Sequence, residues 1–486
     1  MSPVRLTISP HISSSTVYQV AESKSAPSVL TTPAWQHPAR FYWPGTDEFR
    51  QQDEDDQLLL QQIRSRPSHV SPETAKPTPI LPDFLILNIF RLAVQVPGAL
   101  DTNDSEDIQL FTRLHIWDAR HPGLAVSRHT CYSLMLLSKQ WNLATRQFGY
   151  QHIRIRSSKQ LAVFVHLLKQ GSDHADEYPT PGACVRRLDL NVNPSWRWGR
   201  TDYQMLKAVF TMCPNLSCFS TIGSRIPPSN IGLPAFLTSI PHLAPSLKRL
   251  ELVVDQNVLR ALHNSSLNIA VLWIVPAVTL DENTDEEVYT FPSVQTLVAA
   301  KGTENWVRTF ELPSLSAIFM EDGTVEDIPV KEWSRTMMQH VAVKYSWDMV
   351  KLDNERLKGI SIKYSEISKT AIKWPTQLSE SEVQHLTIYD MPTSWSFKPI
   401  HSIGARNSAH ILQENFRQLI GAENFPCLQR VRLLVGVDMA GVLQLPPEMK
   451  RIWKNWVALC RDTGIAVEVL PDGRCANQGA ISTDDL

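Results

Sequence analysis

The sequence predicts an α/β protein in which a short helical region precedes an irregular array of repeated strand units. Apolar residues recur at helical spacing between 81 and 145, and a short strand-like frame of apolar residues then recurs from 150 onward. The chain is also large enough for this plan. Its 486 residues, 43% of them hydrophobic, suffice for two or three domains and a large core.

Residues 1–79 are expected to be disordered. Ser, Thr, Pro and Gln dominate this segment, and its apolar residues follow no regular period, so it has little from which to build a core. An acidic cluster at 53–56 precedes three leucines. We interpret it as part of a solvated tail, with a transient helix or a partner-binding segment as the alternatives.

A first short helix is expected at 81–93. Pro82 suits the first turn of a helix, where the missing N–H would have no partner anyway. One apolar stripe at helical spacing comprises Leu81, Leu85, Ile89 and Leu92. A second apolar stripe runs beside it. A helix so short and so apolar must bury two faces, one of them outside its own region.

These residues resemble an F-box. The family pattern begins with Leu-Pro and an acidic residue, followed by Leu and Ile residues that end in Ile-Phe, as at 81–90 here. After a loop, the family has an apolar run, a Cys or Ser, a basic residue and a Trp two positions on. The matching residues are Leu136, Leu137, Ser138, Lys139 and Trp141. They fall in a second apolar helix expected at 132–145.

Two features depart from the family pattern. Phe84 stands where the family usually has Glu, and the segment between the helices, about 95–130, is far longer than in a compact F-box. Similar Asp-rich insertions occur in many fungal F-box-like proteins, which this chain resembles. We therefore assign 80–170 to an F-box-like helical domain with a long insertion, of which the acidic part is expected to be a loop.

The resemblance implies a partner. An F-box docks a Skp-family adaptor, which links it to a cullin scaffold. The adaptor-facing residues would be Leu81, Pro82, Leu85, Ile89, Leu137 and Trp141. Trp141 has an alternative role as a core residue of the helical domain itself.

A strand, a cap and a helix form a unit from 150 onward. Residues 152–156 alternate as a strand does, Ser158 offers a helix N-cap, and Gly171 follows the expected helix at 159–169. The strand of this unit has a frame in which apolar residues are separated by two positions and then by one. Copies of this strand frame begin near 185, 214, 245, 292, 313, 355, 383 and 426, with degenerate copies near 269 and 340. This frame is typical of leucine-rich repeats, whose strands stack into a parallel sheet with helices behind.

We therefore expect an irregular leucine-rich-repeat solenoid over 171–470. Pro446 and Pro447 start a final helix, which Gly464 ends and which leads to a last strand at 465–469. This ending resembles that of the same fungal group. The polar tail at 471–486 is expected to be loose.

The sequence offers little catalytic chemistry. It lacks phosphate-binding glycine loops, a His-Glu-x-x-His helix and a Gly-x-Ser-x-Gly turn. Its seven cysteines include no Cys-x-x-Cys pair, and Cys213 and Cys218 have no His cluster beside them, which indicates buried thiols in a reducing compartment. We expect no metal, no cofactor and no enzyme activity.

Net charge and hydropathy indicate which partners and which compartment to expect. A net charge of −2 gives no reason to expect nucleic-acid or membrane binding. The N-terminus has no signal-peptide core, and the longest apolar run, at 267–280, is too short to cross a bilayer and contains Pro276. An intracellular protein, cytoplasmic or nuclear, is expected.

One loop stands out as a possible anchor for a target protein. Trp196, Arg197, Trp198 and Arg200 directly follow an early strand. Trp and Arg frequently anchor interfaces. The structural alternative is that one Trp closes the end of the core while the other packs on its Arg.

Together these observations predict a substrate-recognition subunit of a cullin-type (SCF-like) ubiquitin ligase. It would dock a Skp-family adaptor through the F-box and an unknown target protein through the repeats. The alternatives are a repeat-built protein-binding scaffold without a ligase role and an enzyme whose site is assembled from distant residues. An exposed apolar face on the two helices would favour docking, whereas a face buried against the repeats would favour the scaffold.

Overall fold

The computed structural model divides the chain into two units, 1–80 and 81–486. The described residues all belong to the second unit: 82–96, 98–103, 122–137, 141, 147–171, 180–191, 198–223, 232–277, 287–321, 338–342, 356–363, 382–391, 403–421, 425–435 and 447–471. Several predictions lie outside them, namely the disorder of 1–79, the tail after 471, and the roles of Leu81, Trp196 and Arg197.

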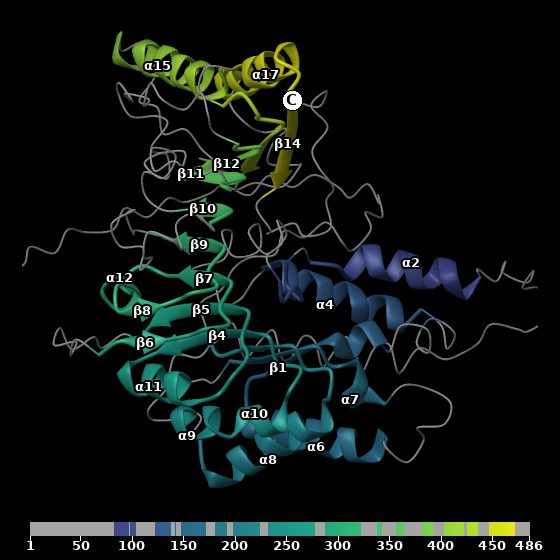
Figure 1. Ribbon diagram of the computed structural model, residues 1–486. Coiled ribbons are helices and arrows are strands. Elements are labelled where there is room, and N and C mark those ends of the chain that lie inside the picture. The colour runs from purple at the N-terminus through teal and green to yellow at the C-terminus, as the bar shows by residue number, and fades with distance from the viewer. Residues whose placement is uncertain are drawn as a thin grey trace, which may run out of the picture. The chain divides into compact units, whose positions relative to one another are not determined.

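The second unit is mixed α/β and contains a 12-stranded parallel sheet (Figure 1). Its strands are β1 (His152–Ile155), β2 (Arg187–Leu190), β3 (Cys218–Ser220), β4 (Arg249–Val254), β5 (Val271–Pro276), β7 (Thr296–Ala299), β9 (Ala317–Met320), β10 (His340–Ala342), β11 (Gly359–Lys363), β12 (His385–Met391), β13 (Arg430–Val435) and β14 (Ala466–Pro471). They are ordered in space as they are in sequence. Two further strands, β6 (Tyr289–Thr290) and β8 (Phe310–Glu311), pair with each other in a small parallel sheet.

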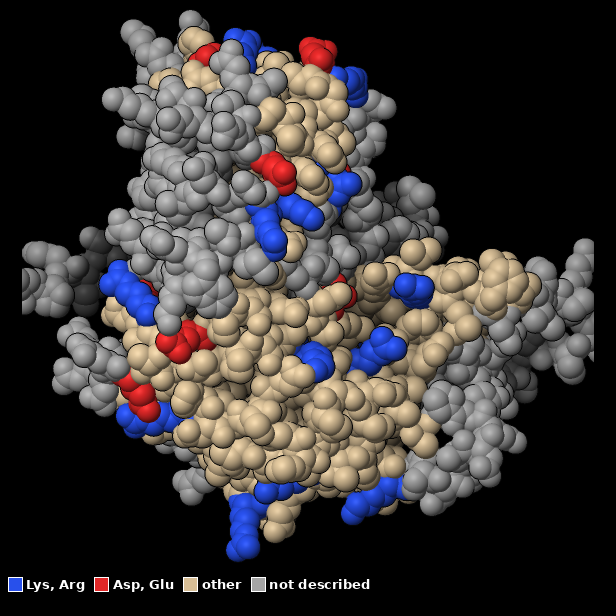
Figure 2. Space-filling model, viewed as in Figure 1, with Lys and Arg blue, Asp and Glu red and all other residues tan. Residues whose placement is uncertain are grey.

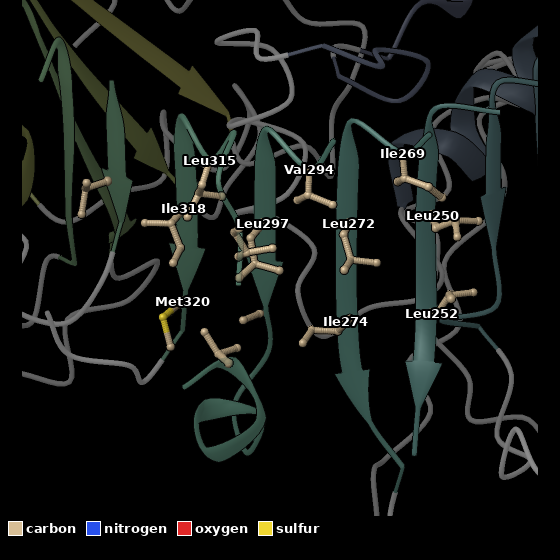
Figure 3. Close-up of a cluster of buried hydrophobic side chains, with 14 of the residues drawn as sticks. Leu250, Leu252, Ile269, Leu272, Ile274, Val294, Leu297, Leu315, Ile318 and Met320 are labelled. Atoms are coloured by element: carbon tan, nitrogen blue, oxygen red, sulfur yellow. The ribbon is translucent and has the colours of Figure 1, made fainter. Parts of the chain in front are cut away.

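The apolar positions of the strand frame stack in rows across one face of the large sheet. Leu250, Leu272, Leu297 and Ile318 stand in register on four neighbouring strands (Figure 3). These side chains are buried in one core cluster that continues from β1 to β14. One strand cannot bury such a row alone, so each unit depends on its neighbours for burial.

Helices cover this face of the sheet, which we call the helix-covered face. They are α6 (Ser158–Gly171), α7 (Pro181–Cys184), α8 (Arg200–Met212), α9 (Leu233–Leu237), α10 (Ile240–Leu243), α11 (Gln256–Asn264), α12 (Glu304–Val307), α15 (Ile403–Ile420) and α17 (Pro447–Asp462). Side-chain caps start some of them. The Asp255 carboxylate, for example, accepts from the Val258 N–H at 2.9 Å at the start of α11.

The C-terminal helix and strand agree with the sequence prediction. Trp453, Trp456 and Cys460 of α17 are buried, and the Trp456 ring stacks on Phe416 of α15 with centroids 4.0 Å apart. Gly464 follows the helix with a φ of 75°, the left-handed geometry that favours glycine at a helix end.

The N-terminal helices are α2 (Asp83–Val94) and α4 (Pro122–Met135), which pack on each other. The first matches its predicted range closely. The second helix was expected at 132–145. Helix α4 begins at Pro122 and ends at Met135, so part of the presumed insertion loop is helical. Of the residues at 138–146, only Trp141 is described, and it is helical as predicted. Periodicity missed the start of α4 because residues 122–131 carry no strong apolar stripe.

The boundary of the helical region also differs from the prediction of 80–170. Strand β1 pairs in parallel with β2, and α6 packs on α8. Residues from His152 onward therefore belong to the sheet and its helix layer, and only the residues before β1 form the separate helical pair.

Candidate docking surface on the N-terminal helices

Large apolar side chains are exposed on α2 and at the end of α4. We call this group the exposed apolar set, and its members are Phe84, Leu85, Ile89, Leu92, Tyr132, Leu136 and Leu137. Leu92 and Leu136 are the most exposed, at 74% and 68%. Scattered apolar residues are normal on a surface, whereas seven on one pair of short helices indicate an interaction site.

The helical pair has a small core of its own, which explains why these residues are left outside it. Phe90 is completely buried, and its ring lies 5.3 Å from that of Trp141 and 6.2 Å from that of Phe148. Cys131 of α4 completes the buried cluster, and burial raises the pKa of its thiol to about 11. One stripe of α2 thus serves folding, and another faces outward.

The structure separates the predicted adaptor-facing residues into two groups. Pro82, Leu85, Ile89 and Leu137 are exposed, and Leu85 and Ile89 lie one turn apart on α2. Trp141 is half-buried and packs against Phe90. This is the packing role that the sequence left open for it.

Residues 96–101, which we call the strap, follow α2 and lie on the second face of the sheet. The Arg187 guanidinium donates to the carbonyl oxygen of Ala99 at 3.0 Å. That of Arg249 donates to the carbonyl oxygens of Gly98 and, at 3.1 Å, Asp101. Val96 and Ala99 also pack in an apolar cluster that includes Trp273, Val298 and Phe319. This first part of the presumed loop is therefore anchored to the sheet.

A row of ionisable side chains, buried at Arg187, Glu251 and Arg249 and partly exposed at His152 and Asp189, lies beside the strap. We call it the charge ladder, and it comprises His152, Asp189, Arg187, Glu251 and Arg249. Arg187 holds Glu251 with two hydrogen bonds of 2.7 and 2.6 Å and Asp189 with an ion pair of 2.8 Å. Arg249 pairs with Glu251 at 2.8 Å. The charges of Arg187 and Arg249 are thus balanced by those of Asp189 and Glu251, while His152 forms a hydrogen bond with Asp189.

The charge ladder shifts the pKa values of its acidic groups. Burial by itself would raise the pKa of the Glu251 carboxyl, but Arg187 and Arg249 hold it below its ordinary value. The same balance lowers the pKa of Asp189, through Arg187 and His152. Both carboxylates are therefore charged at neutral pH, and the guanidinium groups that hold the strap stay fixed by them.

The loop proposed as a target anchor is described only in part. Trp198 is half-buried and packs edge-on against Tyr203, with centroids 5.3 Å apart, beside the core on the helix-covered face. Arg200 is exposed at the first position of α8. The geometry thus gives Trp198 a packing role, and target binding by these residues stays a prediction.

The described residues hold no group of three His, Cys, Asp or Glu side chains arranged to bind a metal ion. Burial raises the pKa of the Cys213 and Cys218 thiols to about 12. Of the helices in the described part of the chain, none has the length and apolar character needed to cross a membrane.

Comparisons with known proteins found no match: no family model fits the chain, and no curated protein resembles it in sequence. Two features of the chain bear on its function: the exposed apolar set, and the resemblance to an F-box carried by 81–90 and 136–141.

Proposed function

We propose that this protein is a substrate-recognition subunit of a cullin-type ubiquitin ligase that docks a Skp-family adaptor through α2 and the end of α4. The observation that carries the proposal is the exposed apolar set. Its residues stay exposed because the helical pair has its own core and because the chain places the strap, not α2, against the sheet. A face buried on the sheet would instead have favoured a scaffold without a ligase role.

The energetics of such a surface suit protein docking. Burying one Leu or Ile side chain contributes about 1.5–3 kcal/mol before the costs of association. Leu85, Ile89 and Leu137 would supply part of the apolar area of such a contact, and Leu92 and Leu136, the most exposed members of the set, would add to it. Pro82, directly before α2, fixes the angle at which the chain enters this surface.

We further infer that the sheet is a degenerate leucine-rich-repeat array which carries the target-binding surface. The sequential order of the parallel strands and the recurring apolar rows support this inference. The protein would hold its target near the ubiquitin-carrying enzyme and so raise the effective concentration of the reactants, without catalysing a step itself. Such a subunit works inside the cell, in cytoplasm or nucleus.

A binding experiment with the full-length protein and a purified Skp-family adaptor tests the docking role. We expect saturable binding by the native chain and its loss in the double variant Leu85→Asp, Ile89→Asp, because each carboxylate would need to be desolvated at the interface. Both positions are exposed, at 38% and 41%, so the thermal unfolding transition should be retained.

The control is Val288→Asp, which places one such carboxylate at an exposed apolar position just before β6. It should bind as the native chain does. If the native chain fails to bind any adaptor, the ligase role is wrong and the protein is a repeat-built scaffold. Equal loss in the control would show that the contact does not involve α2.

A further inference from the structure

A cavity of about 500 Å³ lies where α2, α4, the strap and the first two strands meet. A second cavity of about 490 Å³ lies beside it, between α4, β1 and α6. Arg128, Tyr132 and His152 line both, so the two cavities adjoin, and we call them together the recess. A recess of this size accommodates a small organic ligand of roughly nucleotide size.

The recess is basic. Three arginines from three different parts of the fold line the first cavity: Arg91 in the last turn of α2, Arg128 in α4, and Arg186 just before β2. Lys159 adds a cation to the second cavity. Among the described lining residues, Asp101 is the only carboxylate in the first cavity, and the second has none. Lys and Arg side chains reach the surface near α2 and α4 (Figure 2).

These three arginines differ from the arginines of the charge ladder. Arg187 and Arg249 each pair with carboxylates at 2.6–2.8 Å. Within the described part of the chain, the guanidinium groups of Arg91, Arg128 and Arg186 form no ion pair. Three cations around one cavity that holds a single carboxylate repel one another, and a bound anion would relieve that repulsion.

The remaining wall is apolar and aromatic. Tyr132 and Phe148 line the first cavity together with Val94, Leu100 and Leu124. Aromatic side chains offer flat surfaces on which a ring can stack. Guanidinium groups bind phosphate through paired hydrogen bonds. The recess thus combines a site for phosphate with a site for an uncharged ring.

We propose that this recess binds a phosphorylated small molecule of nucleotide size, with its phosphate groups on Arg91, Arg128 and Arg186 and its ring against Tyr132 and Phe148. This inference shares Tyr132 with the exposed apolar set, but it does not require adaptor docking, because the three arginines and Phe148 lie outside that set. Because the recess is walled by both the helical pair and the sheet, the bound molecule would tie the two together.

Calorimetric titration of the full-length protein with AMP, ADP and ATP at constant ionic strength tests the proposal, with adenosine and inorganic phosphate as the partial ligands. We expect saturable binding whose affinity increases with the number of phosphate groups, and weak or no binding of adenosine. Arg128→Gln and Arg186→Gln should each weaken binding by about tenfold or more, because each removes a charged hydrogen-bond donor. Circular dichroism melts would show whether both variants stay folded.

Lys207→Gln is the matched control, since it removes one positive charge at an exposed position of α8 that lines neither cavity. Its affinity should equal that of the native chain. Three results would each overturn the proposal. They are equal weakening in this control, tight binding in both arginine variants, and no binding of any phosphorylated probe by the native chain.

Discussion

At the scale of single residues, the charge ladder is the feature whose removal should be most costly. Glu251 is 2% exposed and holds both Arg187 and Arg249. Breaking a buried ion pair leaves a charge without compensation, which typically costs about 3–5 kcal/mol. Urea unfolding of Glu251→Gln should show a loss of this order.

The control for that prediction is Glu414→Gln, which removes the carboxylate that faces Arg417 on the surface of α15 at 3.5 Å. Exposed pairs one helical turn apart contribute only about 0.2–0.5 kcal/mol. Comparable losses in the two variants would mean that the charge ladder does not stabilise the fold.

A second residue-scale prediction concerns pH and His152. Burial lowers the pKa of its imidazole below the ordinary value of 6.5. The Asp189 carboxylate opposes this shift, and Arg187 and Arg128 add to it. The unfolded chain therefore binds a proton below about pH 6.5 that the folded chain does not, and stability falls as the pH is lowered through that value.

Unfolding in urea at pH 7.5 and 5.5 measures this effect. His152→Gln should lose less stability than the native chain between the two pH values, while His166→Gln, at an exposed position of α6, should follow the native chain. A native-like pH response in His152→Gln would contradict the assignment.

The sequence did not predict that charged residues of the charge ladder would be buried. Arg187, Arg249 and Glu251 occupy variable positions of the strand frame, which in a repeat array are expected to face a target. Here they are buried beneath the strap. The sequence does hold one clue, since Arg187 and Arg249 share a register across β2, β3 and β4, and charges stacked in register require partners.

At the scale of the elements, the strap decides how the helical pair is held. Gly98 is buried with a φ of 75°, a conformation that costs other residues about 1–2 kcal/mol. Its carbonyl accepts a hydrogen bond from Arg249. Gly98→Ala should therefore loosen the strap and raise amide hydrogen exchange in α2.

Gly464→Ala is the matched control, because Gly464 has the same φ of 75° and a Cβ there would meet nothing within 4 Å. Its effect should appear in α17 and β14 and leave α2 unchanged. If exchange in α2 stays at the native level in Gly98→Ala, the strap does not hold the helical pair.

The elements differ in how far the sequence predicts them. Ten of the 12 strands of the large sheet, β2–β5, β7 and β9–β13, fall in copies of the apolar frame, because each strand must contribute to the same buried rows. The other two, β1 and β14, fall in the strands expected at 152–156 and 465–469. The strap was not predicted, since it binds through the backbone carbonyls of Gly98, Ala99 and Asp101, and backbone groups leave no side-chain pattern. The recess beside it was missed for a related reason, because its arginines come from segments far apart in the chain.

At the scale of the whole molecule, the order of the strands determines how far the destabilising effect of a substitution should extend. Each strand of the large sheet pairs only with the strands before and after it in that order. If the sheet is the repeat array proposed above, its stability is roughly a sum of unit and nearest-neighbour terms. A substitution at one end should therefore leave the other end protected.

Trp456→Ala tests this expectation at the C-terminal end. The substitution removes the ring stacked on Phe416 and should cost about 3–5 kcal/mol. Hydrogen exchange followed by mass spectrometry should show lost protection in β13, β14, α15 and α17, while β2, β3 and β4 keep theirs.

Phe219→Ala, in the core at β3, should give the reverse pattern. Uniform loss along the chain in both variants would mean that the sheet unfolds as one cooperative block, since coupling would then extend beyond neighbouring strands.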